Sequence, residues 1–227
     1  VDAQQQVLFD GTRVSLDTFA AWAEIQLRAT DHVALESTTN AWAVYDVIEP
    51  IVAEVRVADT HKLSLISRSP HKTDQHDALV LAKLLAANLI PAVWVPPDAV
   101  RELRNLIAHR RHLVRDRTAA KNRLHSILHR HNLHLPTGEP FSQANQVWWQ
   151  ALTVSRTERL RVRHDLLQIQ HLSTLIDEVE AEIAQLSVQE PWYDQLAFVI
   201  QIPGIGLLSG MTVLSAIGDI TRFPSPK

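Results

Sequence analysis

One stretch of the chain combines a helix start with two closely spaced acids: His71-Lys72-Thr73-Asp74-Gln75-His76-Asp77-Ala78-Leu79, which runs on into Val80-Leu81-Ala82-Lys83-Leu84-Leu85. Thr73 is predicted to cap the N-terminus of a helix. Asp74 and Asp77 are three residues apart, so they share one helix face. The two carboxylates suit Mg²⁺ or Mn²⁺, which prefer oxygen ligands. The alternative is a pair of solvated acids that interact with the helix dipole.

The residues before this motif alternate between strand-like and helix-like segments. We expect helices from Leu16 to Leu27 and from Trp42 to Ile48, and strands at Val7–Phe9, His32–Leu35 and Val52–Ala58. This β-α-β-α-β order predicts an α/β domain with a parallel sheet flanked by helices. Glu36 follows a strand directly, at the sheet edge where open α/β sheets bind ligands. An exposed loop acid is the competing interpretation.

The segment from Asp98 to about His131 is predicted to form one long amphipathic helix. It carries nine Lys or Arg residues against three acids. Such a density of cations suits phosphate backbones, although a solvated face is the alternative. The predicted nucleic-acid contacts are Lys72, Arg101, Arg104, Arg110, Arg111, Arg115, Arg117, Lys121 and Arg123.

A second long helix is predicted from Leu160 to about Leu186, after a linker at 136–146 that is rich in Pro, Gly, Ser and Asn. Apolar residues recur along it at intervals of three and four, which favours a coiled coil or an antiparallel helix pair. Pairing between copies would give a homo-oligomer. Packing against the basic helix of the same chain is an equal alternative.

Composition restricts the classes of protein to which the chain can belong. It has 227 residues, 46% of them hydrophobic, and no cysteine. These values indicate a globular chain without disulfides or thiolate metal sites, and they fit a reducing cytoplasm. No apolar run reaches membrane-spanning length and no signal peptide is visible, so we expect a cytoplasmic protein. The net charge of -3 argues against nucleic acid, whereas the clustering of cations argues for it.

Two blocks of the sequence resemble one known family. The first runs from Lys72-Thr73-Asp74-x-x-Asp77-Ala78 through Val95-Pro96-Pro97 to Val100-Arg101-Glu102-Leu103-Arg104. It resembles the DEDD transposases of the IS110 family of bacterial insertion sequences. The second block, from Ile202-Pro203-Gly204-Ile205-Gly206 to Arg222-Phe223, is similar to the start of the C-terminal transposase domain of that family.

The resemblance implies an RNase H-like, RuvC-like domain in which four acids hold two Mg²⁺ ions. Glu36, Asp74 and Asp77 would be the second, third and fourth acids. The first acid of the family lies on the opening strand in a Gly-x-Asp context, which this sequence lacks. The nucleophilic serine of the family follows the second block, so none of Ser209, Ser215 and Ser225 is assigned to it.

The resemblance also implies a domain plan and an activity. Residues 1–97 would form the RuvC-like domain without its first strand, 98–190 the long basic helix, linker and coiled-coil-like helix, and 191–227 the start of the transposase domain. The implied activity is metal-dependent DNA strand exchange in transposition, at the bacterial nucleoid and guided by a structured RNA from the element. Because the chain lacks an initial Met and ends within a family block, we expect a fragment that is inactive alone.

Two other functions remain open on the sequence. One is a RuvC-like, metal-dependent nuclease or junction resolvase, which would need no serine-bearing domain beyond Lys227. The other is a helical nucleic-acid-binding protein without catalysis, in which Asp74 and Asp77 are surface acids. Titration with Mg²⁺ separates this second function from the catalytic ones.

Overall fold

The computed structural model describes residues 1–227 except 3, 9–10, 67–72 and 226–227. The chain divides into two compact units, Val1–Val95 and Pro96–Lys227. The second unit contains both of the segments expected after residue 97.

The first unit is a small α/β unit. Its helices and strands are α1 (Phe19–Gln26), β1 (His32–Glu36), α2 (Ala41–Ile48), β2 (Glu54–Ala58), α3 (Thr60–Ile66) and α4 (Asp74–Ala86). Strands β1 and β2 pair in parallel, with His32 opposite Glu54 and Glu36 opposite Ala58. Ala92 adds an antiparallel bridge to Ala58 at the end of β2.

Most local predictions for this unit are confirmed. The predicted β-α-β order appears as β1–α2–β2, and the Thr73 side chain accepts a hydrogen bond from the His76 backbone N–H at 3.2 Å. The first helix begins at Phe19, three residues later than expected, because residues 16–18 form a turn. The strand expected at the chain start is not formed at Val7 and Leu8, and Phe9 lies outside the described residues. The sheet in the described part of the chain therefore has two strands.

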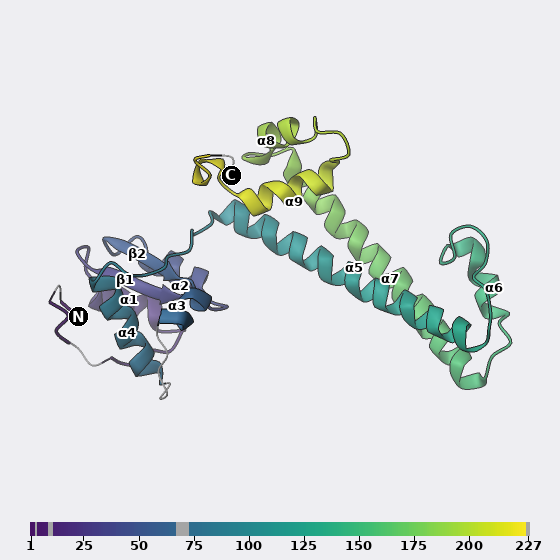
Figure 1. Ribbon diagram of the computed structural model, residues 1–227, viewed down its shortest axis with the longest axis horizontal. Helices are drawn as coiled ribbons and strands as arrows, with labels where there is room; N and C mark the ends of the chain where they lie inside the picture. The colour runs from purple at the N-terminus through teal and green to yellow at the C-terminus, as the bar shows by residue number, and fades with distance from the viewer. Residues whose placement is uncertain (3, 9–10, 67–72, 226–227) are drawn as a thin grey trace. The chain divides into compact units, whose positions relative to one another are not determined.

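The second unit is helical. It contains α5 (Asp98–Arg130), the 3-10 turn η1 (Gln143–Asn145), α6 (Gln146–Gln150), α7 (Arg156–Ser187), α8 (Trp192–Val199), α9 (Leu207–Ile217) and the 3-10 turn η2 (Ile220–Arg222). The two long helices predicted from the sequence are thus confirmed. Figure 1 shows α5 and α7 running side by side, with α6 at one end and α8 and α9 at the other.

Helices α5 and α7 form an antiparallel pair, which we call the hairpin. Arg123 contacts Asp165, Arg117 contacts Ser173 and Arg110 contacts Glu180, so residue numbers fall along α5 as they rise along α7. Leu113 packs against Leu172 and Ile176 between the helices. The apolar side of α7 is therefore used within the chain, as the second of the two sequence interpretations held.

A larger apolar cluster fills the end of the hairpin that carries α6. It joins α5, α6 and α7 through Ala120, Leu124, Ile127, Leu128, Trp149, Leu152, Val162 and Ile169. Trp149 is 1% exposed, and its indole N–H donates to the Pro140 carbonyl at 2.7 Å. We call this end, residues 121–170, the hairpin tip. No helix in the described ranges is both long and apolar enough to cross a membrane.

Candidate nucleic-acid interface

The three carboxylates predicted to bind metal lie on neighbouring elements of the first unit. Glu36 is the last residue of β1, and Asp74 and Asp77 occupy the first turn of α4. The Asp74 side chain is 92% exposed and lies 3.4 Å from Arg13. Among the residues that the structure describes, no three His, Asp or Glu side chains form a group that could hold a metal ion.

The packing of α4 explains why its acids stay apart from the strand. Leu81, Leu84 and Leu85 pack in the same apolar cluster as Ala34 of β1. Leu81 lies seven residues beyond Asp74, or about 10 Å along the helix axis. Asp74 is thus about two turns, and Asp77 about one turn, away from the first residue of α4 that packs against the sheet. Lys72, the predicted nucleic-acid contact beside them, lies outside the described residues.

Most cations of α5 contact partners inside the second unit. Arg110 pairs with Glu180 at 2.6 Å, and Arg123 pairs with Asp165 at 2.7 Å. Arg117 donates to the Ser173 hydroxyl at 3.1 Å, and the Lys121 ammonium lies 5.0 Å from the centre of the Phe141 ring. These side chains hold α5 to α7 and to the linker. Their predicted contacts with nucleic acid stay a prediction.

Two arginines near the start of α5 also have partners within the second unit. Arg101 donates to the Pro96 carbonyl and pairs with Asp98 at 2.8 Å. Arg104 donates to the carbonyl of Ser215 at 2.7 Å, near the end of α9. Burial lowers the pKa of Arg104, and the charge of Arg222 lowers it further. These contacts hold the first turns of α5 to Pro96 and to the end of α9.

Arg111 and Arg115 are exposed side chains on α5. Arg111 is exposed and has no partner in the described parts of the chain. Arg115 has only a loose contact, at 3.7 Å, with its neighbour Asp116. By the register of the antiparallel pair, they lie between the Arg110–Glu180 and Arg117–Ser173 contacts, at the level of the half of α7 that contains Asp177 and Glu178.

The sequence interpretation missed a second group of cations, at the start of α7. Arg156, Arg159, Arg161 and Arg163 are all exposed, and none has a partner among the described residues. The signal was present as four arginines within eight residues. The apolar periodicity of this helix predicts only its buried side, and these arginines are exposed.

The acids near these arginines are already neutralised by α5. Glu158 contacts Arg130 at 3.2 Å and His131 at 2.7 Å, and Asp165 pairs with Arg123. The hydrogen bond from His131 is the main cause that holds the pKa of Glu158 below its ordinary value of 4.5. The arginines of α7 therefore contribute a positive potential that no unpaired carboxylate within residues 156–171 cancels.

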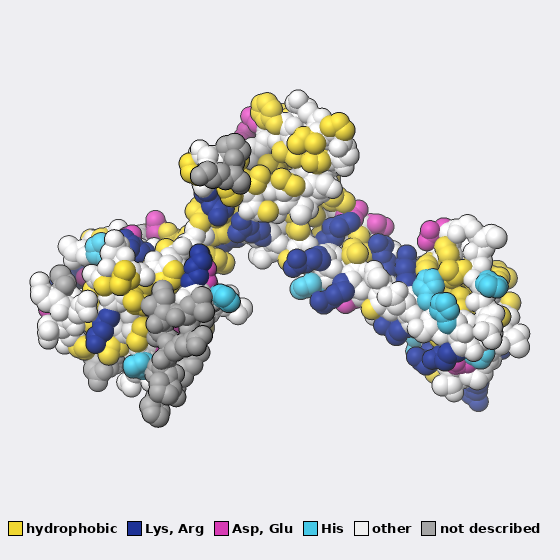
Figure 2. All heavy atoms as spheres, in the orientation of Figure 1, with side chains coloured by type: hydrophobic (Ala, Val, Ile, Leu, Met, Phe, Trp, Pro, Cys, Tyr) yellow, Lys and Arg dark blue, Asp and Glu magenta, His cyan; other side chains and the backbone are white. Residues whose placement is uncertain are grey.

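Charge is thus divided along α7. Residues 156–171 carry four arginines and two paired acids, whereas residues 172–187 carry four acids and no Lys or Arg. Figure 2 shows dark-blue arginine and lysine and cyan histidine side chains together around the hairpin tip. A concentrated positive surface of this kind attracts phosphate groups and raises association rates with nucleic acids. The hairpin tip is the strongest candidate for such contacts in the second unit.

Two comparisons with known proteins agree with each other. The family model of the IS110-type DEDD transposases, described as a transposase, matches residues 1–133. The protein y4qE of Sinorhizobium fredii, which is provisionally named a transposase, is 27% identical over 198 residues. That alignment covers 85% of this chain and 46% of the length of y4qE. The chain thus spans about half of this relative.

Proposed function

Because the chain belongs to the IS110-type DEDD transposases, we propose that it is the part of a transposase that holds DNA, through phosphate contacts at the hairpin tip. The observation that carries this proposal is the separation of the cations of the second unit into two groups. One group is engaged between the helices, and the other projects from the first half of α7 without a partner in the described residues.

The proposal moves the DNA contact from α5 to α7. An arginine that pairs with a half-buried carboxylate must give up that pair to reach a phosphate, and it leaves the carboxylate uncompensated. No such ion pair has to break in the described part of the chain when a phosphate binds the exposed arginines of α7, which are Arg156, Arg159, Arg161 and Arg163. Arginine also binds phosphate in a bidentate manner, which favours it over lysine at such a surface.

We also propose that the complete protein carries out metal-dependent DNA strand exchange. The family implies a divalent ion such as Mg²⁺, and Glu36, Asp74 and Asp77 have the oxygen donors that this ion prefers. In the described residues they do not converge on one point. We therefore propose these acids as ligands in the complete protein and derive no chemical step through the metal. The RuvC-like identity of the first unit and a guide RNA belong to the same proposal.

A binding comparison between two matched double variants tests the DNA contact. Arg161→Gln with Arg163→Gln removes two charges at the hairpin tip, and Arg111→Gln with Arg115→Gln removes two exposed charges beside the acidic half of α7. We expect the first pair to weaken duplex DNA binding strongly and the second pair to weaken it slightly. Equal losses would show that binding follows net charge rather than the tip, and the proposal would be wrong.

A further inference from the structure

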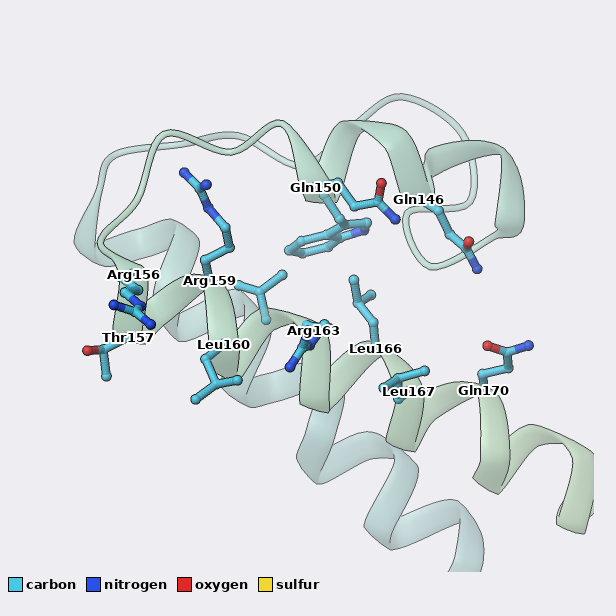
Figure 3. Close-up of a pocket in the computed structure, with 12 residues that line it drawn as sticks. Gln146, Gln150, Arg156, Thr157, Arg159, Leu160, Arg163, Leu166, Leu167 and Gln170 are labelled. Atoms are coloured by element: carbon cyan, nitrogen blue, oxygen red, sulfur yellow. The ribbon is translucent and has the colours of Figure 1, made fainter.

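A groove opens at the hairpin tip between α6 and the first half of α7. Its volume is about 660 Å³, within the range of roughly 300–1,000 Å³ that is typical of ligand sites. Figure 3 shows Gln146 and Gln150 of α6 on one side, and Arg163, Leu166 and Leu167 of α7 on the other. The groove is thus lined by cations, amides and apolar side chains, together with the hydroxyl of Thr157.

The cations of the groove share one face of α7. Arg156, Arg159 and Arg163 are spaced by three and four residues, and all three line the groove. They follow each other along the axis in steps on the order of 5 Å. Arg161 is about 200° around the helix from Arg163 and is not part of the lining. Among the residues that the structure describes, no Asp or Glu lines the groove, so the groove complements a negatively charged occupant.

The floor of the groove is apolar, although it lies beside arginines. Leu160 and Leu167 line the groove and remain 46% and 57% exposed, whereas Val162 and Trp149, which also line it, are buried. A duplex backbone offers only phosphates and sugars and leaves such leucines uncovered. An unpaired strand offers phosphates together with the apolar faces of its bases. The side-chain amides of Gln146, Gln150 and Gln170 match the polar edges of those bases.

We propose that this groove binds an unpaired stretch of nucleic acid, with phosphates on Arg159 and Arg163 and a base against Leu160 and Leu167. The proposal rests on the proposed function, since it names the form of nucleic acid that the same tip holds. Single-strand sites elsewhere combine a basic track with surfaces on which bases stack. Here leucines and glutamines take the place of aromatic rings, because Trp149 is buried.

The test uses the whole 227-residue chain and fluorescently labelled oligonucleotides: single-stranded DNA, single-stranded RNA, duplex DNA and an abasic single strand of equal length. The matched variants are Arg163→Gln in the groove and Arg161→Gln outside it. On single strands, Arg163→Gln should reduce the affinity about 5-fold at 0.1 M salt and Arg161→Gln less than about 2-fold, because each phosphate contact contributes about 0.7 to the salt slope. On duplex DNA the two variants should lose similar amounts.

The abasic strand tests the apolar floor separately. It keeps the phosphates and removes the bases, so the unaltered chain should bind it more weakly than the normal strand. Leu167→Asn, at an exposed position, should bring the normal strand down to the affinity of the abasic one. Equal binding of both strands by the unaltered chain would overturn the base contact. Equal losses from Arg161→Gln and Arg163→Gln on single strands would overturn the groove.

The remaining outcomes distinguish other occupants and the proposed function itself. If polyglutamate binds as tightly as single strands and Arg163→Gln weakens both equally, the groove takes an acidic protein segment and the proposal is wrong. If the chain self-associates in sedimentation and Arg163→Gln dissociates it, the occupant is a second copy. If no nucleic acid binds, the proposed function fails. If duplex binding persists and single-strand binding is indifferent to Arg163→Gln, only the groove proposal fails.

Discussion

Arg123→Met should destabilise the hairpin without removing its DNA contacts. The Arg123 guanidinium binds the Asp165 carboxylate at 2.7 Å and the Gln168 amide oxygen at 2.7 Å. The Asp165 residue is 7% exposed, so the variant leaves a nearly buried carboxylate without its cation. Breaking a fully buried pair from one side costs about 3–5 kcal/mol. Because the Arg123 side chain is 42% exposed, solvent screening lowers the expected cost to about 2–3 kcal/mol.

Urea unfolding followed by far-UV circular dichroism measures this cost. Helices α5 and α7 contain 33 and 32 residues, so the helical signal reports mainly on the hairpin. Arg161→Met is the matched control, because Arg161 is exposed without a partner in the described residues. Its effect should stay within about 0.5 kcal/mol. A double-mutant cycle with Asp165→Asn should give a coupling of about 1–2 kcal/mol.

The opposite result has a clear meaning. If Arg123→Met unfolds at the same urea concentration as the unaltered chain, or the coupling is zero, the pair contributes nothing to stability. Arg123 would then be available to phosphates, as the sequence interpretation held. A large loss of duplex DNA affinity in a folded Arg123→Met variant would also contradict the proposal that the paired arginines of α5 do not contact DNA.

Single substitutions at Glu158, Leu172 and Asp74 test three further features of the structure. The contacts that lower the pKa of Glu158 stabilise the folded chain above pH 4.5, and this contribution is lost as the pH falls through the lowered pKa. The difference in thermal midpoint between the unaltered chain and Glu158→Gln should therefore shrink below pH 4.5, and a difference that stays constant would contradict this prediction. Leu172→Asp places a charge between the helices and should lower the free energy of unfolding of the hairpin by about 3–5 kcal/mol. A variant that stays folded and sediments as a smaller species than the unaltered chain would show instead that α7 joins two copies. Asp74→Asn should change the free energy of unfolding by less than about 0.5 kcal/mol, because Asp74 is exposed. The same substitution should abolish recombination by the complete protein, and near-normal recombination would show that Asp74 is not a ligand in the proposed metal site.

Local features of this fold could be predicted from the sequence because they depend on neighbouring residues. Thr73 caps α4 through a residue three positions later, and the apolar spacing of α5 and α7 sets their length. The partners of the α5 arginines could not be predicted. Arg110 and Glu180 are 70 residues apart, and only the antiparallel register brings them together.

The candidate sites show the same division between local and long-range information. The shared face of Asp74 and Asp77 follows from helix geometry, whereas their distance from Glu36 depends on how α4 packs against β1. A count of cations found the basic character of α5. It could not separate the arginines that face α7 from those that face solvent, since that depends on which side of each helix is buried.

The salt dependence of duplex DNA binding tests the central claim most directly. For the unaltered chain, the logarithm of the binding constant should fall linearly with the logarithm of salt concentration, by about 0.9 for each phosphate contact. Arg161→Gln with Arg163→Gln should reduce the slope by about 1.8, and Arg111→Gln with Arg115→Gln should leave it nearly unchanged. An unchanged slope in the first variant with a reduced slope in the second would place the DNA on α5 and contradict the account.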